Sequence, residues 1–525
     1  MQRRQLFRQL SRVAATLAWQ QLFAPVAQAQ VELQPWTTQA NVFTLGVASG
    51  EPRPDSVVIW TRLAPLPLMP DGGMPARPIP VIWEVAHDEQ FFRIARSGTV
   101  HALPERIHAL HLEVEGLQPG REYFYRFIAA GHVSPLGRTR TAPAPDARPE
   151  RLRMALASCQ HYEAGHFTLH REMAKADLDL VLFCGDYIYT SELSGMQRVR
   201  AHAHQFPYHE ADHSLDDYRI HHAAYKLDLD LQANHAAHPW LMVWDDNEVL
   251  NDYTAESAPA LRDVQAFLRL RTAAYRAYFE HLPISPKREP NQRGMRLQDR
   301  YEWGQLAEFW TVDTRQHRGA QVCYGRYRGA SMWECKAQEA RSRTMLGVDQ
   351  EDWLADTLVA STRAWKFIVQ STQVSPSGIR TPFGTAQSPD GWDAFPAARE
   401  RLLGAIGQPR VQDVVLLGGD VHRHVAANLR LIPKDPQSAV VASEIVTSSL
   451  TSKGLSEFLT SWMRQQHPDT LHCRSDQRGY VLIDVTDQQL VAEFRATAHP
   501  VRPESRSHVQ ARFAIDRGRP GLRRL

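Results

Sequence analysis

The chain has 525 residues, more than one hydrophobic core usually organises, so the length predicts at least two domains. Hydrophobic residues make up 43% and charged residues 22%, which is an ordinary globular balance. A formal net charge of +2, without a long charged run, argues against a nucleic-acid-binding protein. Five scattered cysteines are too few for a disulfide scaffold or a zinc ribbon.

The first residues have the form of a targeting segment. Arg3 and Arg4 precede a modest apolar stretch, residues 13–26, and the small-residue pattern ends at Ala29. This combination favours a twin-arginine signal peptide over residues 1–29, and the alternative is an amphipathic terminal helix. The stretch is too polar for a membrane anchor. The sequence therefore predicts export by the twin-arginine machinery to a periplasmic or extracellular location, with no stable membrane anchor after processing.

Short β-type segments separated by turn signals come next in the chain. Strands are predicted at residues 56–62, 81–86, 110–117 and 122–129. Strands this short and this closely spaced predict a β-sandwich over residues 36–145. A segment rich in proline and alanine, residues 141–150, reads as the linker that follows it.

From residue 151 the pattern changes to strands that alternate with helices. Such alternation predicts an α/β domain with a largely parallel sheet, which we place at residues 150–500, followed by a C-terminal tail at 501–525. Helices are predicted at residues 167–177, within 215–237 and at 264–282. One core strand is predicted in each of the segments 152–158, 181–189, 239–253, 364–372 and 413–424. Two more strands are predicted in residues 300–318, and closing antiparallel strands in residues 478–496.

Four of these strands share one design, in which an apolar run leads directly into a group of metal-type ligands. The groups are Ser158-Cys159-Gln160, Gly185-Asp186-Tyr187-Ile188-Tyr189, Trp244-Asp245-Asp246-Asn247-Glu248 and Gly419-Asp420-Val421-His422. The carboxyl ends of parallel strands meet at one edge of a sheet, where open α/β sheets place their chemistry. We therefore expect the four groups to converge.

The donor set of these groups predicts a metal site with a defined chemistry. A phenolate beside carboxylates suits a trivalent, oxygen-loving ion, and the additional carboxylates suit hard divalent ions. A site of this kind lowers the pKa of bound water and clamps the oxygens of a phosphoryl group. The sequence therefore favours metal-assisted hydrolysis of phosphate esters.

The ordered motifs resemble those of the PhoD-like alkaline phosphatases in the metallophosphatase (calcineurin-like) superfamily. The resemblance covers essentially the whole chain after the signal, in the motifs FTLGVASGEP, VVIWTRLAP, ASCQ, DLVLFCGDYIY, HAAHPWLMVWDD, FWTVDTRQHR, GWDAFPAARERLL and LLGGDVH. It implies a four-layer αββα catalytic domain preceded by a fibronectin-like β-domain. It also implies an exported phosphomonoesterase or phosphodiesterase that uses Fe3+ with Ca2+.

Carried over residue by residue, the resemblance implies two sets of ligands. The iron ligands would be Cys159, Asp186, Tyr189 and His422. Asp186 would bridge to the calcium side, where Asp246 and Asp420 are the further ligands. Taken singly, each has an ordinary alternative: a buried thiol for Cys159, a core aromatic for Tyr189 and a turn histidine for His422. Asp245 is expected to support the site without binding an ion, and Cys184 to belong to the core.

The chain departs from the family at one position, where Asn247 follows Trp-Asp-Asp in place of the usual histidine. An asparagine amide donates a hydrogen bond but cannot transfer a proton at ordinary pH. His424 is a candidate for the missing proton donor, and the alternative is that it is a surface residue. Arg315 could bind a phosphate oxygen or form a surface ion pair. Trp392-Asp393 are candidates for a lid over the site.

Three functions remain open from the sequence. The leading one is an exported metal-dependent phosphoesterase acting on small-molecule phosphate esters. A second function uses the same metals but hydrolyses phosphodiesters, as a phospholipase D-like enzyme that acts on lipids or cell-wall polymers. A third, motivated by Asn247, is a weakly active phosphate-binding protein of the cell envelope. Cys323 and Cys335 lie in one loop and are expected to form a disulfide in an oxidising compartment, the alternative being two free thiols.

Overall fold

A computed structural model of the chain describes residues 36–207, 209–323, 332–333 and 335–525. The expected signal peptide, residues 1–29, lies outside this range. The described chain mixes strands and helices, as the sequence predicts for an α/β protein, and the residues from Thr38 onward form one compact unit. The helices longer than one or two turns are α2 (Thr168–Lys175), α3 (Leu215–Lys226), α4 (Leu229–Ala237), α5 (Val264–His281), α6 (Val348–Ala360), α7 (Pro396–Ile406) and α8 (Glu457–Gln466).

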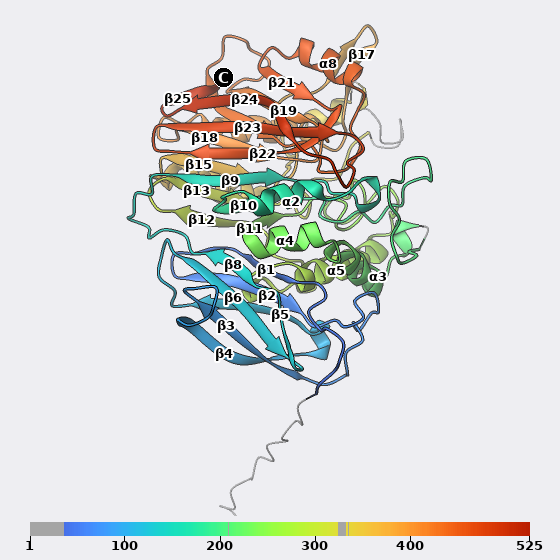
Figure 1. Cartoon of the computed structure of the whole chain (residues 1–525). Coiled ribbons are helices and arrows are strands. Elements are labelled where there is room, and N and C mark those ends of the chain that lie inside the picture. Colours follow the sequence, from blue (N-terminus) through green and yellow to red (C-terminus); the bar gives the residue numbers. More distant parts are fainter. Residues whose placement is uncertain (1–35, 208, 324–331, 334) are drawn as a thin grey trace, which may run out of the picture. The chain divides into compact units, whose positions relative to one another are not determined.

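A ten-stranded sheet carries the first three ligand groups. Its central strands β9, β10 and β11 are parallel, and each is a fully or almost fully buried apolar run (Figure 1). In spatial order the sheet consists of β25 (Arg519–Arg524), β24 (His508–Asp516), β23 (Gln489–Ala498), β22 (Gln477–Val485), β9 (Leu152–Ala157), β10 (Leu180–Cys184), β11 (Pro239–Val243), β1 (Val47–Gly50), β2 (Ser56–Arg62) and β5 (Ala109–Glu115).

A seven-stranded sheet carries the fourth ligand group. Strands β13, β15, β18 and β20 run parallel to their neighbours, and the strands at both edges are antiparallel. Its spatial order is β12 (Asp299–Trp303), β13 (Ala307–Thr311), β15 (Trp365–Val369), β18 (Val414–Gly418), β20 (Val440–Val446), β19 (His424–Arg430) and β21 (Thr470–Arg474).

The period-two alternation of side chains explains how the two sheets are packed. Phe367 and Leu417 belong to the same hydrophobic cluster as β9, β10 and β11, whereas Ile368 and Leu416 belong to a second cluster with α6 and α7. Successive residues of one strand therefore face the other sheet and the covering helices in turn. On the far side, side chains of α2 to α5 join the first cluster.

The N-terminal strands form two sheets, of which one is continuous with the parallel strands β9 to β11. Strand β1 pairs in parallel with β11, so β1, β2 and β5 extend the ten-stranded sheet. The remaining strands form a separate sheet of β4 (Ile94–Ala102), β3 (Ile79–Ala86), β6 (Glu122–Ala129), β7 (His132–Val133) and β8 (Gly137–Arg140). The predicted linker therefore does not separate two independent sheets.

The C-terminal boundary drawn from the sequence needs a correction. Residues 501–525 were expected to form a tail, but β24 and β25 within this range complete one end of the ten-stranded sheet. The alternation in β24 is weak, because arginine and glutamine interrupt its apolar positions and only one face is buried. A strand that is buried on one face only leaves a weaker hydrophobic signature than a strand that is buried on both.

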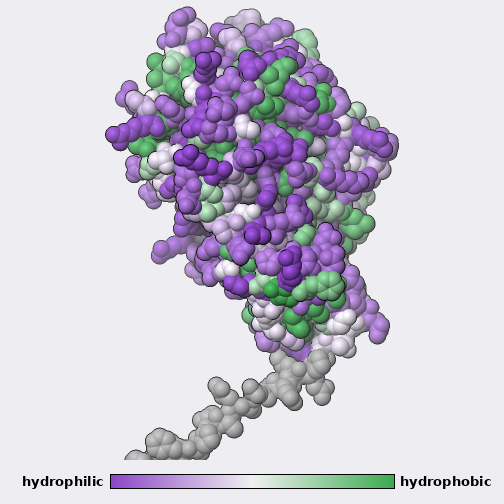
Figure 2. All heavy atoms as spheres, turned by 60° about the vertical axis from the view of Figure 1, so that its left-hand side comes forward, coloured by the Kyte–Doolittle hydropathy of each residue, from purple (hydrophilic) through white to green (hydrophobic). Residues whose placement is uncertain are grey.

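Four smaller features complete the description. Cys323 and Cys335 form a disulfide, as expected from the sequence. A three-stranded sheet of β14 (Met332–Trp333), β17 (Gly384–Gln387) and β16 (Ile379–Thr381) lies near α8 (Figure 1). Among the described residues, no helix is both long and apolar enough to cross a membrane. Figure 2 shows a face on which hydrophilic residues predominate and hydrophobic ones form small separate groups.

Candidate metal centre

The loops after four strands meet at one site. Cys159 follows β9, Asp186 follows β10, Asp245 and Asp246 follow β11, and His422 follows β18. Ligand atoms of Cys159, Asp186 and His422 all lie within 4.8 Å of one another, and so do those of Asp186, Asp245 and Asp246. The expected convergence of the ligand groups is thus present, although the strands that deliver them belong to two different sheets.

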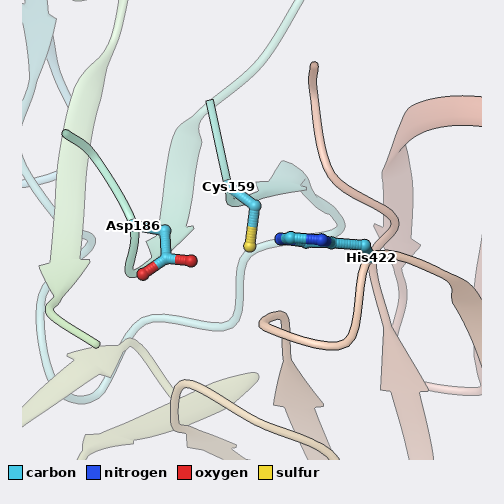
Figure 3. Close-up of side chains that lie close together, drawn as sticks. All are labelled: Cys159, Asp186 and His422. Atoms are coloured by element: carbon cyan, nitrogen blue, oxygen red, sulfur yellow. The ribbon is translucent and has the colours of Figure 1, made fainter. Parts of the chain in front are cut away.

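The first group consists of a thiol, a carboxylate and an imidazole. Figure 3 shows the side chains of Cys159, Asp186 and His422 pointing toward one another from three separate segments of the chain. Tyr189 joins this group, because its phenol oxygen lies 2.7 Å from Asp186 Oδ2 and 3.0 Å from His422 Nε2. All four side chains that the resemblance assigns to iron are therefore neighbours.

The backbone around His422 determines which ring nitrogen is available. His422 Nδ1 lies 2.9 Å from the carbonyl oxygen of Lys453, which can only accept, so Nδ1 carries the hydrogen. Burial lowers the pKa of His422 to about 4, which keeps the ring neutral at neutral pH. Nε2 therefore presents its lone pair to Cys159 and Tyr189, as a metal-binding histidine does.

The second and third groups consist only of carboxylates. Asp186 and Asp246 lie with Asp245, and Asp246 also lies with Asp252 and Asp390, in groups whose ligand oxygens are within 4.8 Å of one another. Burial and the neighbouring acids raise the pKa of Asp186 well above its usual value. Burial, opposed in part by Arg315, raises that of Asp246 to about 6. Without a cation the carboxylates oppose each other's ionisation.

Asp420, the remaining carboxylate expected to bind a metal, lies at the border of this cluster. Its Oδ2 accepts a hydrogen bond from Thr372, and it belongs to none of the three groups with mutually close ligand atoms. Burial, Asp245 and Asp390 raise its pKa well above the usual range. Asp420 therefore experiences the same negative field as the other acids.

Arg315 is a buried partner of these acids, not a surface residue. Its Nε donates to Asp245 Oδ1 at 2.6 Å, and its two Nη atoms donate to the oxygens of Asp390 at 2.8 Å. Arg318 pairs with Asp390 as well. Burial alone would raise the pKa of Asp390, but the guanidinium groups of Arg315 and Arg318 outweigh it and lower this pKa to about 2. The alternative of a surface ion pair is therefore wrong, and Arg315 holds the acids of the site in this structure.

Asn247 lies between the candidate ligands. Its Nδ2 donates to Asp186 Oδ1 at 3.1 Å and to Asp246 Oδ1 at 3.0 Å, and 7% of the residue is exposed. The amide is thus at the site, where the resemblance expects a histidine. Its donors interact with the carboxylates in this structure, and any contact with a substrate oxygen would compete with them.

His424 corrects both sequence expectations. It is neither a surface residue nor a proton donor at the site, because it is fully buried in β19 on the inner side of the sheet. Its Nδ1 accepts from the Ser448 amide at 2.9 Å, and its Nε2 donates to the Arg495 carbonyl at 3.1 Å. Both ring nitrogens are committed to backbone groups, so the ring has a structural role.

Two further side groups behave as core residues. Cys184 is fully buried within β10, as expected. Trp392 and Asp393, candidates for a lid, are buried in a short 3-10 helix just before α7, where Asp393 accepts hydrogen bonds from Arg399 and the Ser377 amide. A pair fixed in this way does not act as a movable cover.

The motifs predict no role for Asp252 or Asp390, and they contain Glu248 only as a member of the group after β11. Glu248 accepts from the Tyr187 amide at 2.6 Å and from the Asp245 amide at 2.9 Å, and thereby joins the loops after β10 and β11. Asp252 donates its amide to Asp246 Oδ2 at 2.7 Å. Glu248 stands inside the motif and could have been proposed from it, whereas Asp390 lies in an irregular segment without a strand signal.

Backbone strain marks the same loops. Cys159, Asp186, Asp420 and His422 have φ values of 57°, 58°, 64° and 51°, in the left-handed region that residues other than glycine rarely adopt. Such strain persists where the surroundings enforce it and is concentrated at functional sites. No pattern in the sequence predicts it for these four residue types.

The residues present fit a metal centre. Asp245 Oδ2 is buried and has no hydrogen-bond partner among the described residues, which is costly for a carboxylate oxygen without a cation. Hard oxygen donors lie beside a thiol, a phenol and an imidazole lone pair, a set that suits more than one type of ion. A buried acid-rich cluster at the strand ends of an α/β fold has the form of a metal-dependent hydrolase.

Comparison with known proteins identifies the family. The PhoD-like phosphatase family matches residues 154–494, and the N-terminal domain of PhoD-like phosphatases matches residues 27–143. Alkaline phosphatase D of Bacillus subtilis (strain 168) is 40% identical over 496 residues, which cover 92% of this chain and 82% of that protein. A solved structure described as the structure of PhoD has a TM-score of 0.88 and 38% identity, and the match covers 93% of both chains. The chain therefore belongs to the PhoD-like phosphatase family and is an enzyme of the phosphoric ester hydrolase class.

Proposed function

We propose that this chain is an exported, metal-dependent phosphoesterase that hydrolyses phosphomonoesters, phosphodiesters or both. The observation that carries the proposal is the buried convergence of Cys159, Asp186, Tyr189 and His422 beside the carboxylates that follow β11. The family and the relative named alkaline phosphatase D support the reaction class. The phosphodiesterase and phosphate-binding alternatives rest on no separate observation.

The proposal assigns two kinds of ion to the site. Fe3+ would be held by Cys159, Asp186, Tyr189 and His422, and Ca2+ by Asp186, Asp246 and Asp420. The close contact of a phenol with an imidazole lone pair supports the iron side, and the excess of carboxylates supports a divalent ion. When bound, the ions would supply Lewis acidity for the in-line attack of water on phosphorus.

The chain's own residues have distinct tasks in this proposal. Arg315 holds the carboxylates of Asp245 and Asp390 in place and offsets part of their mutual repulsion. Glu248 fixes the distance between the loops after β10 and β11. Asn247 orients an oxygen of the phosphoryl group through its amide, but supplies no proton to the leaving oxygen. Substrates with good leaving groups should therefore be favoured.

The remaining sequence expectations belong to the same proposal. Residues 1–29 would direct export by the twin-arginine machinery, with cleavage after Ala29 and a periplasmic or extracellular location. Residues 36–145 would form a fibronectin-like sandwich, and residues 150–525, with β24 and β25 included, a four-layer αββα catalytic domain. The two sheets packed face to face, with helices on their outer sides, support the latter arrangement.

The test compares metal-loaded with metal-stripped protein on two soluble substrates, an aryl phosphate and an aryl phosphodiester. We expect turnover that is lost on chelation and restored by adding iron and calcium together. The ratio of the two rates assigns the substrate class. Turnover no higher than that of the stripped protein would contradict the proposed activity and favour a binding protein. Replacing Arg3 and Arg4 by lysine tests export separately, since the precursor should then remain in the cytoplasm.

A further inference from the structure

A set of exposed aromatic and aliphatic side chains gathers at α8 and the β16–β17 hairpin. Phe458 is 77% exposed and Trp462 36% exposed on α8, Leu455 is 47% exposed just before this helix, and Phe383 is 86% exposed at the tip of the hairpin. We call these four residues the aromatic face. Large apolar side chains are usually buried, so three exposed aromatic residues and an exposed leucine in neighbouring segments call for a partner.

The geometry of α8 aligns this face. Phe458, Trp462 and Gln466 are spaced by four residues and form one stripe along the helix, while Thr460 and Met463 are buried on the other side. Gln466 Oε1 accepts a hydrogen bond from the Arg380 amide of β16 at 2.7 Å, which holds the hairpin against the end of the stripe. Figure 1 shows α8 and β17 beside each other at the same end of the molecule.

The charges around the aromatic face are mainly positive. Arg380, Lys453 and Arg464 lie in or next to these segments, and none of them forms an ion pair with another residue in the described part of the chain. The acid of α8, Glu457, is engaged by the Ser475 amide at 3.0 Å. Apolar side chains surrounded by unpaired cations match the headgroup region of an anionic membrane.

The aromatic face adjoins the metal centre. The Lys453 carbonyl accepts from His422 Nδ1, and Leu455 follows two residues later in the same loop. Thr451 and Ser452 of this loop also bond the backbone around Cys159. The loop that carries Leu455 therefore also contacts two of the candidate iron ligands, so a surface that covers the aromatic face would lie near the candidate metal centre.

We propose that the aromatic face docks the protein onto an anionic phospholipid surface. Phe383, Phe458 and Trp462 would enter the boundary between headgroups and acyl chains, and Arg380 and Arg464 would lie among the phosphates. The attachment is peripheral and reversible. The proposal concerns membrane binding, so its test is independent of the proposed phosphoesterase activity.

The test measures co-sedimentation of the full chain with vesicles of phosphatidylcholine, with and without phosphatidylglycerol. The variant F383S/F458S removes the two most exposed aromatics, and the matched control L66S/F92S removes a 54% and an 86% exposed residue from the N-terminal region. We expect wild type to bind the phosphatidylglycerol vesicles, and F383S/F458S to bind them at least about tenfold more weakly, since two aromatic side chains leave the lipid. The control should bind as wild type does.

A second variant, R380E/R464E, tests the electrostatic part. It should weaken binding to phosphatidylglycerol vesicles and reduce its dependence on salt, while turnover of a soluble aryl phosphate stays unchanged in all variants. Equal binding of wild type and F383S/F458S would overturn the proposal, and so would wild type that binds neither kind of vesicle. If sedimentation velocity instead shows a dimer that F383S/F458S dissociates, without vesicle binding, the face is an interface between copies and the proposal is wrong.

Discussion

The phenol oxygen of Tyr189 lies 3.0 Å from Nε2 of His422 and 2.7 Å from Oδ2 of Asp186, and with Asp186 ionised one hydrogen must serve both contacts. The single phenol hydrogen can reach Asp186 or His422, and the imidazole hydrogen is on Nδ1, at Lys453. Whichever acceptor takes the phenol hydrogen, the other faces an oxygen lone pair at short distance. A shared cation would turn this repulsion between lone pairs into coordination, which is why the pair supports a metal centre.

Replacing Tyr189 by phenylalanine should remove iron from the protein. The variant loses a phenolate ligand, so the visible absorption that arises from charge transfer between phenolate and ferric ion should disappear, and the iron content should fall. Metal analysis and a visible spectrum of the purified protein measure both. Tyr187→Phe is the matched control, because that phenol bonds His235 at 2.8 Å and lies away from the ligands. An absorption band that survives in Tyr189→Phe would assign the colour to another ligand.

The stabilisation that a divalent ion gives the protein should grow with pH. In the metal-free folded state burial and neighbouring acids raise the pKa of Asp246 to about 6 and those of Glu248 and Asp252 to about 8. Raised carboxyl pKa values mean that protons compete with the ion below these values and leave as pH rises. The rise in Tm on adding Ca2+ should therefore be larger near about pH 9 than near about pH 6. The difference in Tm between metal-loaded and metal-stripped protein is taken at each pH, because the contributions of titratable groups remote from the site then cancel. A constant difference would argue against binding at these acids.

Asn247→His should change leaving-group preference. The wild-type amide cannot protonate the leaving oxygen, and general-acid assistance is typically worth about 10²–10⁴-fold. The variant should therefore raise kcat on alkyl phosphates by roughly tenfold or more, and change kcat on aryl phosphates much less. A steady-state comparison of the two substrates, with metal content matched, measures the ratio.

The same comparison has a control in His424. Because both of its ring nitrogens bond backbone groups, His424→Asn should lower Tm and leave the aryl-to-alkyl ratio unchanged. A ratio that collapses in His424→Asn, while Asn247→His leaves it unchanged, would return the proton-donor role to His424.

Glu248→Gln should loosen the metal centre as well as the fold. The carboxylate accepts from two backbone amides, whereas a glutamine has only one acceptor, so one amide loses its partner at a cost of about 1–3 kcal/mol. Glu444→Gln is the matched control, because Glu444 accepts from the Val374 and Ser375 amides in a similar way. Both variants should lower Tm, but only Glu248→Gln should lower metal content. Equal metal loss in both would show that general destabilisation is the cause.

The sequence is most informative where an apolar strand leads into a motif. The bounds predicted for β2 and β6, and the proximity of Cys159, Asp186, Tyr189 and His422, follow from uninterrupted local patterns. The partners of these residues were missed because they are long-range. Arg315 meets Asp390 across 75 positions, and no local pattern reports such a pairing. For His424, position beside the motif favoured the site, but the alternation of β19 directs its ring between the sheets.

The pairing of β1 with β11 has a consequence for biosynthesis. Ser49 finds its partner Pro239 only after the ribosome has produced β9, β10 and the helices between them. The N-terminal strands therefore remain with one edge of β1 unpaired while β9 and β10 are being made. A chain arrested before β11 would expose that edge to other nascent chains, so delays in translation between residues 50 and 239 should be the ones most prone to cause aggregation.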